Sequence, residues 1–173
     1  MLEDLLAPKL RVVFCGTAAG ARSAALGQYY AGRGNRFWDI LAATGLTPRL
    51  LVPSEHHLLP TFRIGLTDIA KHQSGNDVDI DFRPADAAAL RAKILRYQPR
   101  LLCFNGKRAA REFLGRHTVD YGSHDEAVGV TSLFVAPSTS GAARASWDAS
   151  IWHDLARQAR RLDGGGAGVP PSW

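Results

Sequence analysis

Three segments of the sequence carry residue types that could bind a ligand and react with it, and each follows a short apolar run. The first, at 16–38, is rich in glycine and arginine and contains the adjacent Tyr29 and Tyr30. The second, GLTDIAKH, carries Asp68, and the third, PSTSGAARASW, carries hydroxyl groups and Arg144. A glycine-rich turn can bind an anion through its backbone N–H groups, and a carboxylate can serve in acid–base chemistry.

Common nucleotide and metal signatures are missing from these segments. Gly16, Ala18 and Gly20 lack the third glycine of a GxGxxG turn, and the sequence contains no GK[ST] phosphate loop. The six histidines show neither HExxH nor Cys/His spacing, so we assign no metal and expect no cofactor. A nucleotide-binding or hydrolase domain that merely shares an α/β layout stays an alternative, although no nucleophile–base pair supports it.

Hydrophobic patterning predicts the elements that position the three segments. Apolar runs predict strands at 11–15, 64–69, 101–104 and 131–136. Helices are predicted at 23–26, 36–44, 84–97, 107–114 and 146–162, the last capped by Ser146, with irregular chain at 46–63 and 72–82. Strands without polar alternation, separated by helices, favour a parallel sheet covered on both faces. In such a sheet ligands bind beyond the carboxyl ends of the strands, where all three segments emerge.

Composition narrows the class of protein. The chain has 173 residues, of which 46% are hydrophobic and 21% charged, as expected for one globular domain. Glu3 and Asp4 stand where a secretory signal would carry positive charge, and no uncharged run approaches the ~18 residues of a membrane span. Cys15 and Cys103 lie in apolar stretches and are interpreted as buried thiols in a reducing compartment. The net charge of +5 permits a polyanionic partner without requiring one.

Five sequence blocks occur in order between Arg11 and Trp147: GTAAG, QYYAGRGNRFW, GLTDI, LLCFNGK and VAPSTSGAAR. Together they resemble the mismatch-specific uracil/thymine-DNA glycosylase branch of the uracil-DNA glycosylase superfamily. In that branch the first block reads GINPG, a GN[RH]FW block follows at similar spacing, and the last block reads NPSGLSR or a serine-rich variant. The resemblance implies a single three-layer α/β/α domain with a central four- or five-stranded parallel sheet. It also implies a pocket that receives a base flipped out of DNA.

The resemblance assigns the base pocket to the strand ends and to the first segment. Tyr30 matches an aromatic residue that stacks on the flipped base; the alternative is a loop aromatic that packs on the core. The backbone N–H groups of Thr17 and Ala18 would stabilise the uracil anion as it leaves. The residues expected to contact the base are Gly16, Gly20, Ser23, Tyr30 and Asn105.

Ala18 departs from the family, which usually has an asparagine there to hold the attacking water. A methyl group cannot hold water, so another residue must take over, or catalysis is slow or absent. Asp68 is the candidate replacement, because its carboxylate could orient the water and offset the positive charge on the sugar. It could instead accept N3–H of uracil, or merely cap the end of its strand.

Asn105 has two interpretations as well. In the wider superfamily an asparagine at a comparable strand end reads the uracil edge; the alternative is a cap for the helix that begins at Lys107. The third segment would contact phosphates and fill the gap left by the flipped base. Ala142 stands there at the position of the family's leucine, and because a methyl fills the gap poorly, Arg144 would share the task. The residues assigned to DNA binding are Ser138, Ser140, Gly141, Ala142 and Arg144.

Two functional hypotheses follow. The first is a monofunctional, monomeric uracil-DNA glycosylase that uses water to release uracil, and some other damaged bases, from single- or double-stranded DNA, leaving an abasic site for base-excision repair. The second, prompted by Ala18, is a catalytically weak or inactive protein that binds uracil-containing or abasic DNA. Either would act in a bacterial-type cytoplasm, at the nucleoid and away from membranes. We place the domain at 1–163 and a flexible C-terminal tail at 164–173.

Overall fold

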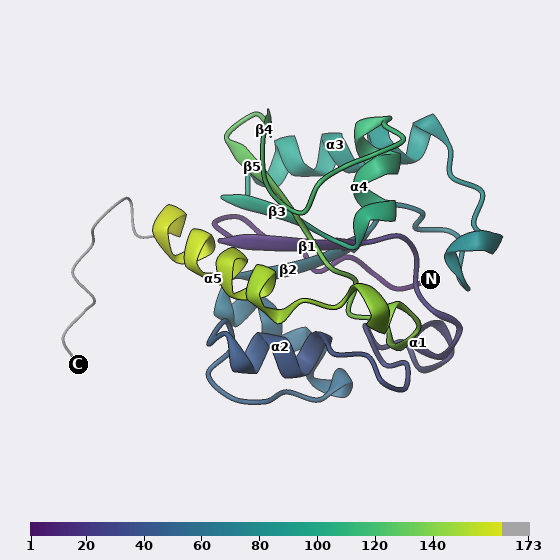
Figure 1. The fold of residues 1–173 in the computed structure, drawn as a ribbon, viewed down its shortest axis with the longest axis horizontal. Coiled ribbons are helices and arrows are strands. Elements are labelled where there is room, and N and C mark those ends of the chain that lie inside the picture. Colours follow the sequence, from purple (N-terminus) through teal and green to yellow (C-terminus); the bar gives the residue numbers. More distant parts are fainter. Residues whose placement is uncertain (164–173) are drawn as a thin grey trace.

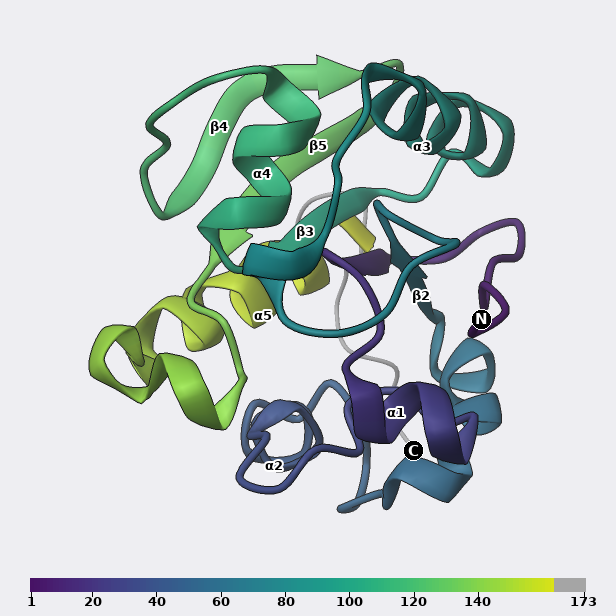
Figure 2. The same cartoon turned by 90° about the vertical axis from the view of Figure 1, so that its right-hand side faces the viewer.

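A five-stranded sheet runs through the centre of the computed structural model, which describes residues 1–163 (Figure 1). The strands are β1 (Val12–Gly16), β2 (Ile64–Asp68), β3 (Leu101–Asn105), β4 (Gly122–Val128) and β5 (Thr131–Ala136). Their order across the sheet is β2-β1-β3-β5-β4, so β1 lies between β2 and β3. Figure 2 views the molecule from the carboxyl ends of the parallel strands. The tail predicted at 164–173 lies outside the described residues.

Four of these strands are parallel and buried, which confirms the prediction of a parallel sheet covered on both faces. In β1, Phe14 enters the core on one face of the sheet and Cys15 enters the core on the other. Cys15 and Cys103 are buried free thiols, also as predicted. The pairing of β1 with β2 places Gly16 beside Asp68 at the carboxyl end of the sheet.

The strand β4 is not predicted by the sequence, and it makes the sheet mixed rather than wholly parallel. It pairs antiparallel with β5 through a tight turn at Gly129, whose φ of 58° suits a residue without a side chain. Its sequence, GSHDEAV, is polar, and its side chains alternate between partly and fully exposed positions along most of the strand. An edge strand has one side open to water, so hydrophobic patterning does not reveal it.

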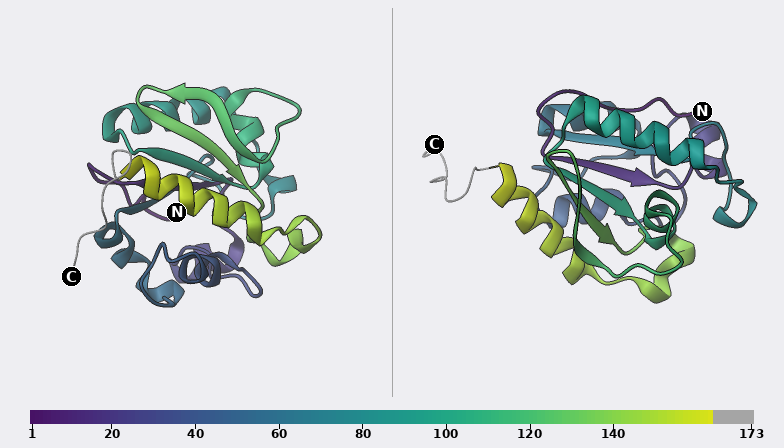
Figure 3. Two further views of the ribbon diagram at one scale, coloured as in Figure 1. Left: turned by 60° about the vertical axis from the view of Figure 1, so that its left-hand side comes forward. Right: turned by 90° about the horizontal axis from the view of Figure 1, so that it is seen from above.

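Helices cover both faces of the sheet (Figure 1, Figure 3). One face is covered by α1 (Ala21–Leu26), α2 (Phe37–Ala43), α5 (Ala149–Asp163) and the 3₁₀ helix η1 (Pro53–Phe62). The other face is covered by α3 (Pro84–Tyr97) and α4 (Lys107–Leu114). Two further 3₁₀ helices, η2 (Asp77–Asp79) and η3 (Gly141–Ser146), lie toward the carboxyl end of the sheet. The three-layer α/β/α arrangement is therefore confirmed.

Three local predictions need correction. The chain at 46–63 and at 72–82, expected to be irregular, contains η1 and η2. The last helix begins at Ala149 rather than at Ser146, which instead ends η3. Its first turn is capped by Asp148, whose carboxylate accepts the N–H of Ser150 at 3.0 Å and the hydroxyl of Ser150 at 2.6 Å. These hydrogen bonds hold the pKa of Asp148 below its ordinary value, and a negative charge there also suits the helix dipole.

Trp152 connects the sheet, α2 and the third segment. Its ring is fully buried, stacks on Phe14 with centroids 5.5 Å apart, and meets Phe37 edge-on at 6.4 Å. Its indole N–H donates to the carbonyl of Pro137, the first residue after β5, at 3.0 Å. The core is thus bonded directly to the start of the third segment.

We predict that Trp152→Ala lowers the free energy of unfolding by about 3–5 kcal/mol, because it removes a buried ring and its hydrogen bond. Leu95→Ala, at a half-exposed position of α3, is the control and should cost less than about 1 kcal/mol. Urea denaturation followed by circular dichroism measures both. A cost for Trp152→Ala as small as that of the control would show that this ring is not central to the fold.

Candidate active site

A cleft of about 690 Å³ opens where the three segments meet, at the carboxyl ends of β1, β2 and β3. The first and third segments form its walls, and the chain at 75–78 contributes to the rim. Gly141 and Arg144, which the sequence assigns to DNA binding, belong to the third segment but do not line the cleft. The other residues with predicted roles all line the cleft: Gly16, Thr17, Ala18, Gly20, Ser23, Tyr30, Asp68, Asn105, Ser138, Ser140 and Ala142.

Gly16 forms the floor of the cleft. A Cβ atom on Gly16 would lie 2.8 Å from Asp68 Oδ1 and 3.4 Å from the hydroxyl oxygen of Tyr30. Cβ atoms do not approach a carboxylate oxygen so closely, so a residue without a side chain is needed to leave room for Asp68. The two distances also show that the Asp68 carboxylate and the Tyr30 hydroxyl converge over the end of β1.

Asp68 is a buried carboxylate paired with Lys71. Only 6% of its surface is exposed, and its Oδ2 lies 3.5 Å from Lys71 Nζ. Burial raises the pKa of Asp68 above its ordinary value, while Lys71 opposes the rise. A carboxyl group with a raised pKa beside a cleft is a candidate for acid–base or electrostatic catalysis. The three-residue spacing of Asp68 and Lys71 is the sequence signal that could have indicated this pair.

The N-terminal segment contributes to the site in a way that sequence reasoning missed. Leu5 pairs antiparallel with Leu66 along the outer edge of β2, through two backbone hydrogen bonds of 2.9 Å. This pairing places the carboxylate of Asp4 2.9 Å from Lys71 Nζ and 2.7 Å from Lys93 Nζ. Burial acts to raise the pKa of Asp4, but hydrogen bonds from Lys93 and Lys71 outweigh it and hold that pKa below its ordinary value.

Tyr30 packs on the core and also lines the cleft. Its ring stacks on Phe37 with centroids 4.0 Å apart, so the core-packing alternative is confirmed for one face of the ring. Its φ of 53° lies in the left-handed region, which is uncommon for an aromatic residue. Its hydroxyl is buried and makes no hydrogen bond of normal geometry among residues 1–163. Burial and then the charge of Asp68 raise its pKa, whereas the nearby Asn105 side chain opposes the rise. A buried polar group without a partner is uncommon, which makes this hydroxyl a candidate to bind a ligand in the cleft.

Asn105 holds the third segment against the end of β3. Its Nδ2 donates to Thr139 Oγ1 at 2.9 Å, and its Oδ1 accepts the N–H of Thr139 at 3.0 Å. The helix α4 follows Gly106 without a side-chain cap, so the predicted capping role of Asn105 is wrong. The Asn105 amide bonds to Thr139 and not to the start of α4, because the N–H and hydroxyl of Thr139 are buried and need hydrogen-bond partners. Reading a uracil edge with the remaining amide hydrogen and lone pair stays a prediction.

Side chains of the first segment make hydrogen bonds that fix the backbone around the cleft. The hydroxyl oxygen of buried Ser23 accepts the N–H of Ala31 at 3.0 Å. The Thr17 hydroxyl donates to the carboxylate of Asp77 at 2.6 Å, which ties the turn to the rim. The Thr17 carbonyl accepts the N–H of Ala70 at 2.7 Å. The predicted contacts of Ser23 and of the Thr17 backbone with a base stay predictions.

The third segment is a series of short turns. Ser138 Oγ accepts the N–H of Ser140 at 3.2 Å, and Ser140 Oγ accepts the N–H of Ala142 at 3.3 Å. The exposed Arg144 donates from Nε to the carbonyl of Gly141 at 3.3 Å. Its guanidinium therefore folds back on its own turn, and the expected sharing of the wedge task by Arg144 stays a prediction.

A second groove, of about 580 Å³, lies between the β4–β5 pair and α5, away from these residues. Two of its arginines are engaged, because Arg157 is paired with Asp154 and Arg160 donates to the carbonyl of Thr44 at 3.0 Å. Among residues 1–163, no three His, Cys, Asp or Glu side chains form a group that could hold a metal. Within the same residues, no helix has the length and apolarity to cross a membrane.

A family model and a solved structure both match this chain. The model of the uracil DNA glycosylase superfamily matches residues 3–156, so the chain belongs to that superfamily. The fold is similar to the solution NMR structure of a Methanosarcina acetivorans protein that is provisionally named a uracil DNA glycosylase. The TM-score is 0.55 at 22% identity, covering 92% of this chain and 96% of that one. At this identity the likeness supports the fold, and the branch indicated by the motifs stays a prediction.

We predict that Asn105→Ala loosens the third segment, because the buried N–H of Thr139 loses its acceptor. The free energy of unfolding should fall by about 1–3 kcal/mol. Hydrogen exchange followed by NMR should show faster exchange at the Thr139 amide than in the unmodified protein. Asn105→Asp keeps an acceptor for that N–H and is expected to protect it better than alanine does. Unchanged exchange in Asn105→Ala would contradict the clamp.

Proposed function

We propose that this protein is a DNA glycosylase that removes uracil, and some other damaged bases, by hydrolysing the N-glycosidic bond. One observation carries the proposal: a buried Asp68 carboxylate and the Tyr30 hydroxyl converge over Gly16 at the floor of a cleft. Membership of the uracil DNA glycosylase superfamily supports the same class of reaction. The proposed partner is DNA, single- or double-stranded, and the proposed working form is a monomer.

The cleft suits a base that has been turned out of the DNA stack. A base inside a duplex cannot reach the floor, so it must rotate outward, at a cost of a few kcal/mol of lost stacking and pairing. One face of the Tyr30 ring is packed against Phe37, and the base is proposed to stack on the other face. The small side chains of Ala18 and Ala19 in the lining leave room for bases larger than uracil.

Water is the proposed nucleophile. Its oxygen forms a bond to C1′ of the sugar as the N-glycosidic bond breaks, and the bonding electrons leave with N1 of the base. The proton lost by the water passes to Asp68 or to solvent. The backbone N–H groups of Thr17 and Ala18 would stabilise the departing anion, as fixed dipoles do for charge that develops during reaction.

Asp68 takes the part that an asparagine usually plays at the position of Ala18. As a carboxylate it would orient the water and offset the positive charge on the sugar, an effect typically worth about 10²–10⁴-fold in rate. Accepting N3–H of uracil is the alternative, whereas the O2 and O4 acceptors of the base would be repelled. Lys71 is not proposed as a nucleophile, because Asp4 and Tyr29 hold its ammonium and it does not belong to the cleft lining.

A binding protein without turnover is the second candidate. It is favoured by the presence of alanine at position 18. Its methyl group lines the cleft where the superfamily usually offers a water-holding amide. Such a protein would bind uracil-containing or abasic DNA in the same cleft and hold it.

Single-turnover cleavage of oligonucleotides distinguishes the two candidates. Single and double strands would carry uracil, thymine opposite guanine, hypoxanthine, xanthine or ethenocytosine, and alkali would then break the abasic products. We expect cleavage at uracil and at one or more of the larger bases. Cleavage at uracil alone would contradict the permissive pocket. A stable complex with uracil-DNA that is never cleaved would support the binding protein instead.

We predict that Asp68→Asn, which keeps the shape and removes the charge, lowers single-turnover uracil excision at least tenfold while DNA binding changes little. If Asp68 only reads the base edge, binding and base preference should shift together with a smaller loss of rate. Unchanged rate and selectivity would leave Asp68 as a structural cap. Ala18→Asn restores the usual amide and should partly rescue Asp68→Asn if both positions hold one water.

A further inference from the structure

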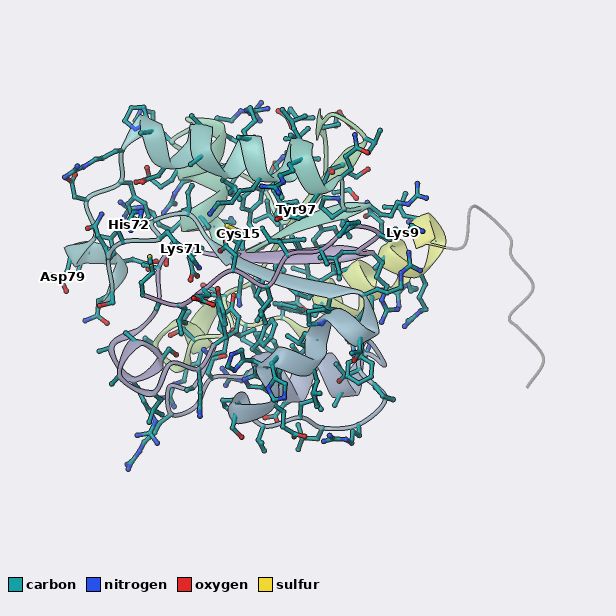
Figure 4. All side chains as sticks on the ribbon, turned by 180° about the vertical axis from the view of Figure 1, so that it is seen from behind. Lys9, Cys15, Lys71, His72, Asp79 and Tyr97 are labelled. Atoms are coloured by element: carbon teal, nitrogen blue, oxygen red, sulfur yellow. The ribbon has the colours of Figure 1, made fainter. Side chains whose placement is uncertain are left out.

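Lys71 lies at the centre of a buried network of polar contacts behind the cleft. Its Nζ lies 2.9 Å from Asp4 Oδ1 and 3.5 Å from Asp68 Oδ2, and it donates to the Tyr29 hydroxyl at 2.8 Å. Only 13% of its side chain is exposed. Lys71 acts electrostatically on Cys15 of β1, and Figure 4 shows Asp79 at the outer tip of the segment that follows Lys71. Three oxygen partners match the three donors of an ammonium group.

The partners of Lys71 are held in place by other contacts. Asp4 also pairs with Lys93 of α3 at 2.7 Å. The Tyr29 hydroxyl donates to the backbone carbonyl of Glu3 at 2.8 Å. The N-terminal segment on the outer edge of β2 therefore provides two of the anchors that fix the ammonium. Lys71 cannot turn away from Asp68 without losing these contacts.

The two carboxylate oxygens of Asp68 face different surroundings. Oδ2 faces the ammonium of Lys71. Oδ1 is the atom that lies above the missing side chain of Gly16, close to the Tyr30 hydroxyl, and both residues line the cleft. One oxygen is thus directed at a cation and the other at the floor of the proposed base pocket.

The titratable groups around Asp68 come from several elements. Two of these groups are cations. Lys71 contacts Asp68 directly, whereas Lys93 contacts Asp4. The charge of Asp4 opposes ionisation of Asp68. Burial, and then the charge of Asp68, raise the pKa values of the neighbouring thiol and phenols, so these groups stay neutral. The groups are Asp4 of the N-terminal segment, Cys15 of β1, Tyr29 and Tyr30 of the first segment, Lys71 after β2, and Lys93 of α3.

We propose that Lys71 is a positioning residue that keeps Asp68 ionised and directs its Oδ1 into the cleft. The inference rests on the proposed function, in which Asp68 acts as a carboxylate on the water or on the sugar cation. Without Lys71, the buried carboxyl group would face Asp4 with no cation in contact, and its protonated form would be favoured. Asp4 and Tyr29 serve this role indirectly by holding the ammonium in place.

A purely structural role for Lys71 leads to a different expectation. If the network only supported the fold, its removal would lower the rate by the same factor at every pH. An electrostatic role instead changes the pH dependence, because removal of the cation raises the pKa of Asp68 further. At a given pH a smaller fraction of Asp68 is then ionised, and the deficit disappears as the pH rises above the new pKa.

The test is the pH dependence of single-turnover uracil excision in the full chain and three variants. Lys71→Met should lose at least tenfold in rate at about pH 6, with a deficit that narrows as the pH rises. Lys71→Arg keeps the cation and should stay within about threefold of the unmodified protein. Lys93→Met, the matched control, removes a cation from the same Asp4 carboxylate without touching Asp68. Lys93→Met should shift the acid limb of the pH–rate profile much less than Lys71→Met does.

A pH-independent loss in Lys71→Met, or an equal shift of the acid limb in Lys93→Met, would overturn the inference. Titration of the Asp68 carboxyl carbon by ¹³C NMR, without DNA, separates this inference from the proposed function. If uracil is not excised but Lys71→Met still raises the pKa of Asp68, the proposed function fails and the electrostatic role stands. If uracil is excised and that pKa is the same in both proteins, the inference fails alone. Lys71→Gln replaces Lys71→Met should the latter not fold.

Discussion

Burial of a carboxylate at the end of β2 is the constraint on which the rest of the site depends. A buried charge is costly unless it is paired and hydrogen-bonded, and the pairing group here is Lys71, at 3.5 Å from Asp68. Space for the carboxylate exists because β1 ends in Gly16, where a Cβ atom would lie 2.8 Å from Oδ1. The ammonium in turn is fixed by Asp4, which the N-terminal segment places against the outer edge of β2. The neighbouring strands and the N-terminal segment are therefore both parts of one electrostatic arrangement.

The walls of the cleft are held by hydrogen bonds between segments that are distant in sequence. Thr17 bonds to Asp77, and Asn105 makes two hydrogen bonds to Thr139. Ser23 is occupied in the same way by the loop that follows α1. Because these side chains hold the backbone, the Asp68 carboxylate and the Tyr30 hydroxyl are the side-chain groups at the end of β1 and β2 that the proposed chemistry uses. The proposed function assigns to Asp68 the task for which Ala18 has no polar group.

The sequence was sufficient for the elements that have a strong apolar signal. The four parallel strands and the helices at 84–97 and 107–114 were predictable because runs of buried residues, Pro84 and the bounding glycines mark them. The edge strand β4 was not, because its polar alternation matches that of a loop. The convergence of three segments on one cleft was predictable from the rule for parallel sheets. The role of Asp4 was not, since local patterning does not show which distant residue an N-terminal carboxylate will contact. The same limit applies to Asn105, whose partner Thr139 is chosen by tertiary packing.

The placement of Asp68 against the base and the sugar can be tested by a crystal structure with DNA containing 2′-fluoro-2′-deoxyuridine, because the fluorine destabilises the sugar cation and keeps the base attached. We expect the uracil to lie over Gly16, with its ring against Tyr30. Oδ1 of Asp68 should lie within hydrogen-bond distance of a water near C1′, while Oδ2 stays beside Lys71. Uracil bound outside the cleft, or Asp68 turned away from both the base and the sugar, would contradict the proposed role of Asp68.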